Sequence, residues 1–231
     1  MTKAALIVAH GQPSDPAPAE AELAALAAKV QAFMPDWSVA SATLAAPGAL
    51  ADRVAELGPA GVVYPMFMSG GWFTRTHLPA RLAEAGGAAW RVLPPFGEDA
   101  AVQALTVTLA REAAALRPVA EVEVLLAAHG SFRSPAPSEV ARAMANRIQT
   151  ETGFARVASG FIDQSPRIAE VATGFAPGSI VLPFFAARGG HVIDDLPQAL
   201  DEAGFTGTVL QPVGLDCRVP ALIAAALRAG V

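Results

Sequence analysis

The 231-residue sequence is poor in several residue types, and each shortage excludes a class of protein. Only 16% of the residues are charged while 53% are hydrophobic, and a disordered chain needs the opposite balance. Long apolar runs are missing too, because no run approaches the roughly 18 residues of a membrane-spanning helix. A net charge of −5 disfavours general binding to nucleic acid. We therefore expect a globular protein that partners neither nucleic acid nor a membrane.

Cysteine is nearly absent, since Cys217 is the only one in the chain. A single thiol excludes an internal disulfide, a cysteine-based zinc site and an iron–sulfur cluster built from this chain alone. The sequence also lacks a P-loop, a Gly-x-Gly-x-x-Gly fingerprint and a Gly-x-Ser-x-Gly elbow, so nucleotide binding and serine hydrolysis have no motif support. Any metal site in this chain would use nitrogen and oxygen ligands.

The chain is an imperfect tandem repeat. The apolar string that ends in His10-Gly11 recurs as the string that ends in His129-Gly130, and further blocks match in the same order with almost no drift. Two copies of this length predict duplicated globular domains, at residues 1–118 and 119–231. Because the N-terminal string has an internal copy, we interpret it as a buried strand and not as a secretory signal, and we expect a cytoplasmic protein.

Each copy alternates apolar runs with alanine-rich segments. In the first copy we predict strands at residues 4–9, 38–43, 61–66 and 90–93, and helices at residues 19–34, 50–57, 78–85 and 100–116. The strands are continuous apolar runs, which is typical of strands buried on both faces. Repeated strand–helix units predict an α/β fold with a four-stranded parallel sheet flanked by helices in each copy. In such sheets, ligands bind at the C-terminal ends of the strands.

Three of the four histidines fall at this predicted edge. His10 and His129 each end the first strand of their copy, and His191 follows Gly189-Gly190 beyond a later strand of the second copy. Asp163 ends a further strand of that copy. Two imidazoles and a carboxylate on adjacent strand ends predict a site that holds Co²⁺, Fe²⁺ or Ni²⁺ loosely, unlike a closed structural zinc site.

The first copy lacks this set of side chains. It keeps His10 but has Leu44 and Trp72 where the sequence alignment of the copies places Asp163 and His191. We therefore predict that the functional site lies in the second copy.

The second copy resembles the sirohydrochlorin chelatases of the CbiX type, which are class II chelatases. The resemblance rests on the strand-His-Gly element, on Phe-Ile-Asp-x-x-Pro at residues 161–166, and on Leu-Pro-Phe-Phe-x-x-x-Gly-Gly-His-Val-x-x-Asp-Leu-Pro at residues 182–197. Both copies fit the long two-domain form, so the resemblance covers essentially the whole chain. It implies two tandem chelatase-like domains, each a four-stranded parallel sheet flanked by helices, that face each other across a cleft.

The resemblance also implies an activity. The expected enzyme is a lyase that inserts Co²⁺ or Fe²⁺ into sirohydrochlorin without ATP, on the way to cobalamin or sirohaem. Its metal is a substrate, its small-molecule partner is the tetrapyrrole, and no organic cofactor is expected.

Site residues follow from the resemblance and from the substrate's chemistry. His129 and His191 match the two motif histidines, with expected roles in catalysis and metal binding, and Asp163 stands where the family usually has glutamate. Arginines suit forked contacts with the many carboxylates of the substrate, and aromatic rings suit its flat face. The expected substrate-binding residues are Arg133, Arg188, Arg75, Trp72 and His10.

Two other interpretations stay open at this point. A non-catalytic protein of the same fold could bind metal or tetrapyrrole without turnover, and a sugar- or nucleotide-binding pair of α/β domains would not depend on the histidines. The sequence leaves open the physiological metal and pathway, and whether His10 and His77 contribute ligands. We expect a monomer, because the duplication can supply the pairing that single-domain relatives obtain by dimerising.

Overall fold

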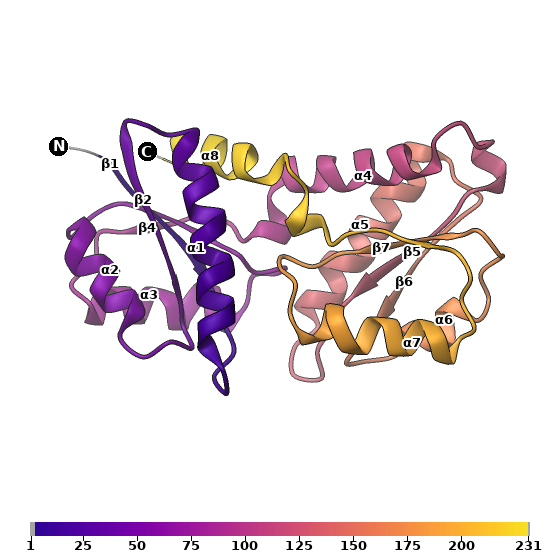
Figure 1. Cartoon of the computed structure of the whole chain (residues 1–231), viewed down its shortest axis with the longest axis horizontal. Coiled ribbons are helices and arrows are strands. Elements are labelled where there is room, and N and C mark those ends of the chain that lie inside the picture. Colours follow the sequence, from indigo (N-terminus) through magenta and orange to yellow (C-terminus); the bar gives the residue numbers. More distant parts are fainter. Residues whose placement is uncertain (1–2, 231) are drawn as a thin grey trace. The chain divides into compact units, whose positions relative to one another are not determined.

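The computed structural model describes residues 3–230 and contains two parallel four-stranded sheets, which confirms the predicted fold class (Figure 1). The first sheet has the order β2-β1-β3-β4, with strands β1 (Lys3–Ala9), β2 (Trp37–Thr43), β3 (Val62–Pro65) and β4 (Arg91–Val92). The second has the order β6-β5-β7-β8, with strands β5 (Glu123–Ala128), β6 (Arg156–Phe161), β7 (Ile180–Pro183) and β8 (Thr208–Val209).

Helices cover both faces of each sheet (Figure 1). On the first sheet, one pair of packed helices is α1 (Pro16–Ala32) with α8 (Val219–Ala229), and the other is α2 (Ala49–Leu57) with α3 (Leu78–Glu84). On the second sheet, the pairs are α4 (Ala100–Ala114) with α5 (Ala136–Thr152), and α6 (Ile168–Ala172) with α7 (Leu196–Glu202). Short 3₁₀-helices lie at Phe96–Glu98, Val119–Glu121 and Val213–Leu215. Within residues 3–230, no helix has the length and apolar character needed to cross a bilayer.

The chain folds into two compact units whose limits differ from the predicted boundary between residues 118 and 119. Unit 1 consists of Met1–Phe96 and Cys217–Val231, and unit 2 consists of Gly97–Asp216. Helix α4 belongs to the first repeat but packs on β7 of unit 2, whereas α8 belongs to the second repeat but packs on β3 of unit 1. The repeats therefore exchange their last helices. The sequence pattern could not show this, because both helices present the same alanine-rich apolar face.

The sequence pattern explains most of the elements. Residues 4–8 of β1 are all buried, as expected for a strand covered on both faces. In α1 the buried residues are Leu23, Ala27 and Val30, which recur at helical spacing on one face. Helix α1 begins three residues before the predicted start, because Pro16 occupies its first position, where a missing N–H costs nothing.

The exchange of helices can be tested by removing a buried side chain of α8. Ile223 is fully buried, so Ile223→Ala should cost about 2–5 kcal/mol of stability. Because α8 packs in unit 1, hydrogen exchange of amides in β1 and β3 should accelerate before that in β5 and β7. The matched control is Val107→Ala in α4, which should accelerate exchange in unit 2 instead. The reverse pattern would contradict the exchange.

Candidate functional site

The predicted site residues of the second repeat lie together at one edge of the second sheet. His129 directly follows β5, Asp163 follows β6, and His191 begins a π-helix, η4 (His191–Asp195), in the connection from β7 to α7. The backbone N–H of Asp163 donates to the carbonyl of His129 over 2.9 Å, which fixes the ends of β5 and β6 against each other. Gly130 has a φ of +73°, a value that a glycine adopts without strain, and the chain turns there directly after His129.

The two imidazoles touch through their outer nitrogen atoms. The Nε2 atoms of His129 and His191 are 2.7 Å apart, and the ring planes are nearly perpendicular at 89°. This is a hydrogen-bond distance, and the tautomers of the two rings decide which nitrogen donates. The side chains are 38% and 45% exposed, which leaves the pair accessible to a ligand.

A carboxylate lies near the Nδ1 atom of each imidazole, on the side away from the other ring. The Nδ1 of His191 lies 2.6 Å from Oδ2 of Asp195, to which its N–H donates. The Nδ1 of His129 lies 2.8 Å from the carbonyl oxygen of Gly130 and 3.5 Å from Oδ2 of Asp163. Such partners fix the tautomer and the orientation of an imidazole and raise its basicity as a ligand. Both rings are therefore held with Nε2 facing the other ring.

This pair has the chemistry of an open two-nitrogen metal site. Metal–imidazole bonds of about 2.0–2.1 Å need the two Nε2 atoms to move apart by a few tenths of an ångström before both can bind one ion. Two imidazoles leave the remaining coordination positions of that ion to other ligands. Among residues 3–230, no cluster of three or more histidine, cysteine or acidic side chains is arranged to hold a metal.

The predicted arginines of unit 2 lie in the loops beside the pair. Arg188, in the loop between β7 and η4, donates from Nη2 to Oε1 of Gln211 over 2.8 Å and lines a cavity of about 560 Å³. The cavity shares the η4 segment with His191, because Val192 and Ile193 line it as well. Arg133 is exposed in the loop after His129.

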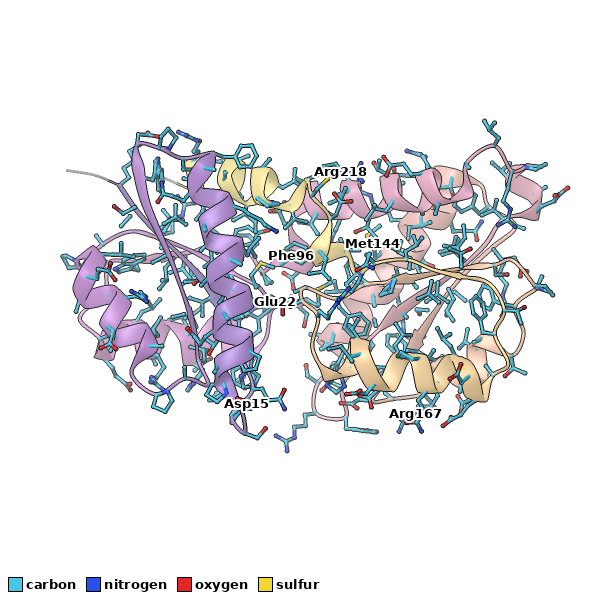
Figure 2. The ribbon with its side chains drawn as sticks, in the orientation of Figure 1. Asp15, Glu22, Phe96, Met144, Arg167 and Arg218 are labelled. Carbon is cyan, nitrogen blue, oxygen red and sulfur yellow. The ribbon has the colours of Figure 1, made fainter. Side chains whose placement is uncertain are left out.

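Beside Arg133, the ring of Phe132 is 73% exposed and lies 5.5 Å from the guanidinium of Arg167, which is labelled in Figure 2. Sequence reasoning did not single out Arg167 as a site residue. It precedes α6 at the same end of the sheet as Asp163, so its place in the loop after β6 was the available signal.

The structure corrects the alignment of the first repeat with this site. Unit 1 has a matching π-helix, η1 (Phe73–His77), followed by α3 as η4 is followed by α7. Phe73 therefore takes the place of His191, and its ring lies 4.5 Å from that of His10. The prediction that Trp72 takes this place was wrong by one residue, because the π-helix begins after it.

A second position is corrected in the same way. The N–H of Ala45 donates to the carbonyl of His10 over 2.9 Å, just as that of Asp163 donates to His129. Ala45, and not Leu44, is therefore the counterpart of Asp163. Both residues are apolar, so the first repeat still lacks the carboxylate.

The predicted residues thus fall into two groups, one in each unit. Unit 2 holds His129, His191, Asp163, Arg133 and Arg188, while unit 1 holds His10, Trp72 and Arg75. Sequence reasoning missed Asp195 as the partner of His191. The spacing of four residues between them was the available signal, but it marks a contact only once the segment is known to be helical.

Comparisons with known proteins find one family model and several solved structures that match this chain. The CbiX family model matches residues 123–229, which include both histidines and both carboxylates. A solved structure of CbiX, described as the terminal enzyme for biosynthesis of siroheme in denitrifying bacteria, is 47% identical, with a TM-score of 0.90 over 99% of this chain and 100% of its own.

Two more distant structures share the fold. SirB from Bacillus subtilis with Fe³⁺ is 17% identical, with a TM-score of 0.76 over 100% of this chain and 96% of its own. The sirohydrochlorin chelatase SirB from Bacillus subtilis subspecies spizizenii in complex with cobalt is 17% identical, with a TM-score of 0.68 over 100% of this chain and 95% of its own. No curated protein matches the sequence.

The role of Asp195 can be tested on metal affinity. Asp195→Asn removes the charge that accepts the N–H of His191, so the affinity for Co²⁺ should fall roughly 10- to 100-fold. Titration of the protein with Co²⁺, followed by absorbance or calorimetry, measures it. Asp194→Asn is the matched control, because it changes the neighbouring carboxylate of the same π-helix and should leave the affinity unchanged. If both variants lose the same amount of affinity for Co²⁺, the effect comes from the loss of one negative charge and not from the hydrogen bond between Asp195 and His191.

Proposed function

We propose, since the chain belongs to the CbiX family, that it inserts a divalent metal ion, Fe²⁺ or Co²⁺, into sirohydrochlorin without ATP. The observation that carries the proposal is the His129–His191 pair, backed by Asp163 and Asp195 at a sheet edge. The 47%-identical relative is described as the terminal enzyme of siroheme biosynthesis, which favours the sirohaem branch and iron over the cobalamin branch and cobalt.

The geometry accounts for both tasks of such an enzyme. The two Nε2 atoms bind the incoming ion as weak, open-site ligands and remove part of its water shell. Insertion also releases two pyrrole protons from the macrocycle, and imidazole accepts protons near neutral pH. As the ion moves to the ring nitrogens, the two Nε2 atoms become free, and the pair can take up one of these protons while the other passes to solvent. Asp163 and Asp195 keep both rings oriented through this exchange.

The substrate's carboxylates need local positive charge on a protein whose net charge is −5. Arg188 and Arg133 supply it in unit 2, on loops next to the imidazole pair. A guanidinium forms two parallel hydrogen bonds with a carboxylate, which favours arginine over lysine here. Arg75, Trp72 and His10 are the proposed substrate contacts of unit 1.

Substitution of each histidine tests which unit carries the chemistry. His129→Ala and His191→Ala should each lower the rate of metal insertion by on the order of 10²-fold or more, because each removes a ligand and a proton acceptor. His10→Ala should cost less, since Phe73 stands opposite it, and His77→Ala should be mild. The rate is followed by absorbance of sirohydrochlorin with Co²⁺ or Fe²⁺.

Two results would count against the proposal. Loss of activity in His10→Ala with wild-type rates in His191→Ala would place the site in unit 1. Tight binding of metal and sirohydrochlorin by the wild-type protein, without any insertion, would favour a binding protein of the same fold over an enzyme.

The arginines should affect substrate capture more than turnover. Arg133→Ala and Arg188→Ala should raise the KM for sirohydrochlorin by a larger factor than they lower kcat, since the guanidinium contacts the substrate's periphery and not the reacting nitrogens. Arg147→Ala is the control, because Arg147 pairs with Glu151 on α5. If both loop variants have the wild-type KM and kcat, Arg133 and Arg188 do not contact the substrate.

A further inference from the structure

The peptide bond between Gly130 and Ser131 lies between the imidazole of His129 and a glutamine of the next loop. Its carbonyl oxygen, on Gly130, is 2.8 Å from Nδ1 of His129. Its N–H, on Ser131, donates to Oε1 of Gln164 over 2.8 Å. The peptide is trans, so its C=O and N–H groups point in opposite directions. One planar unit therefore contacts the imidazole at one end and the side-chain amide at the other.

The contact with the carbonyl determines which nitrogen of a neutral His129 carries the proton. A carbonyl oxygen only accepts hydrogen bonds, so Nδ1 must be the donor. Oδ2 of Asp163 lies 3.5 Å from the same Nδ1, which is longer than the usual range of a hydrogen bond, but its charge favours the same tautomer. The lone pair of His129 is then on Nε2. Because Nδ1 of His191 likewise donates to Asp195, two lone pairs converge on one point, which a metal ion or a proton can occupy.

Gly130 leaves the orientation of this peptide to its hydrogen bonds. Glycine has no side chain that limits rotation of the neighbouring peptide planes, and Gly130 already has a φ of +73°. It also leaves room for Gln164, because a Cβ atom at this position would lie 2.7 Å from Cγ and 2.9 Å from Oε1 of that side chain. Gln164 therefore packs directly over the turn whose N–H group it binds.

The same turn forms in unit 1 without a glutamine. Gly11 has a φ of +75° there. Ala45 is the counterpart of Asp163, so Ala46 stands where unit 2 has Gln164, and a methyl group cannot accept a hydrogen bond. The turn itself therefore does not depend on this acceptor, and of the two units only the one with the imidazole pair has it.

We propose that Gln164 is a positioning residue for His129, which acts through the Gly130–Ser131 peptide to keep the Nε2 lone pair directed at the incoming ion. Hydrogen bonds in a chain polarise one another, so the bond from Ser131 to Gln164 makes the carbonyl of Gly130 a stronger acceptor for the imidazole. Without Gln164 the peptide can rotate, and Nδ1 loses the partner that fixes its proton. The role of His129 as a metal ligand rests on the proposed function, whereas its tautomer does not.

The tautomer of His129 tests this role in the absence of metal. Gln164→Met keeps the length of the side chain but replaces its oxygen acceptor by a weakly accepting sulfur, and Gln164→Glu keeps an oxygen acceptor. Long-range proton–nitrogen NMR correlations are recorded at about pH 8.5, where imidazole is neutral. The wild type and Gln164→Glu should show the proton on Nδ1, and Gln164→Met should show a mixture of both tautomers. A Gln164→Met spectrum with the wild-type tautomer would overturn the proposal.

Titration with Co²⁺ measures the consequence for metal binding. Gln164→Met should raise the Kd for Co²⁺ about tenfold, the low end of the range for residues that hold a metal ligand in place, while its far-UV circular dichroism stays that of the wild type. The matched control is Gln198→Met, which should leave the Kd unchanged, because Gln198 is exposed on α7 and its amide contacts Glu202.

The two measurements separate this proposal from the proposed function. A wild-type Kd in Gln164→Met would contradict the positioning role, since the lone pair of His129 would then be available to the ion without Gln164. If the wild-type protein itself binds no Co²⁺, the proposed function falls, and the NMR comparison still decides whether Gln164 fixes the tautomer of His129.

Discussion

The chemistry assigned to unit 2 depends on one contact, the 2.7 Å approach of the Nε2 atoms of His129 and His191. Pairing of β5 with β7 brings these residues, distant in sequence, to the same sheet edge. The π-helix η4 then begins at His191, and its first backbone bond, from the N–H of Leu196 to the carbonyl of His191, sets the position of the ring. A shift of strand register or conversion of this turn to an α-helical one would separate the two nitrogens.

The two units show that side chains, and not backbone, decide what this edge can bind. Each sheet has the same order, and each has a five-residue π-helix in the same connection, a feature that is frequent at functional sites. Of four equivalent positions, one is histidine in both units (His129 and His10), and three differ: unit 2 has His191, Asp163 and Asp195 where unit 1 has Phe73, Ala45 and His77. One set presents nitrogen lone pairs with charged support, and the other presents mainly flat apolar surface.

The periodicity of the sequence was sufficient to predict both sheets, but not the π-helices and the exchange of the last helices. The repeat and its apolar runs predicted both parallel sheets, and strand-end histidines predicted the pairing of His129 with His191. The π-helices were missed, because an extra residue in a turn leaves no mark on apolar spacing. Trp72 was misplaced because Gly70-Gly71 was matched to Gly189-Gly190, one residue out of step with the strands and helices on either side. Asp195 was omitted because its contact with His191 depends on this segment being helical. The exchange of α4 and α8 was missed because interchangeable alanine-rich faces carry no information about which sheet they cover.

A chelatase must release the ion that it binds, and a site with two imidazole ligands is expected to have a low affinity for that ion. In the proposed reaction, the carboxylates of Asp163 and Asp195 would raise the basicity of the imidazoles and so favour binding of the ion, while within residues 3–230 no third histidine, cysteine or acidic side chain is placed to bind it with them. A closed four-ligand site would trap the metal, whereas here the other coordination positions are open to solvent and macrocycle. Ring nitrogens can therefore enter one at a time before an imidazole leaves. Because the freed Nε2 atoms face each other 2.7 Å apart when the pair closes, one of the two protons released by the macrocycle could bridge them in the proposed reaction, and the other passes to solvent.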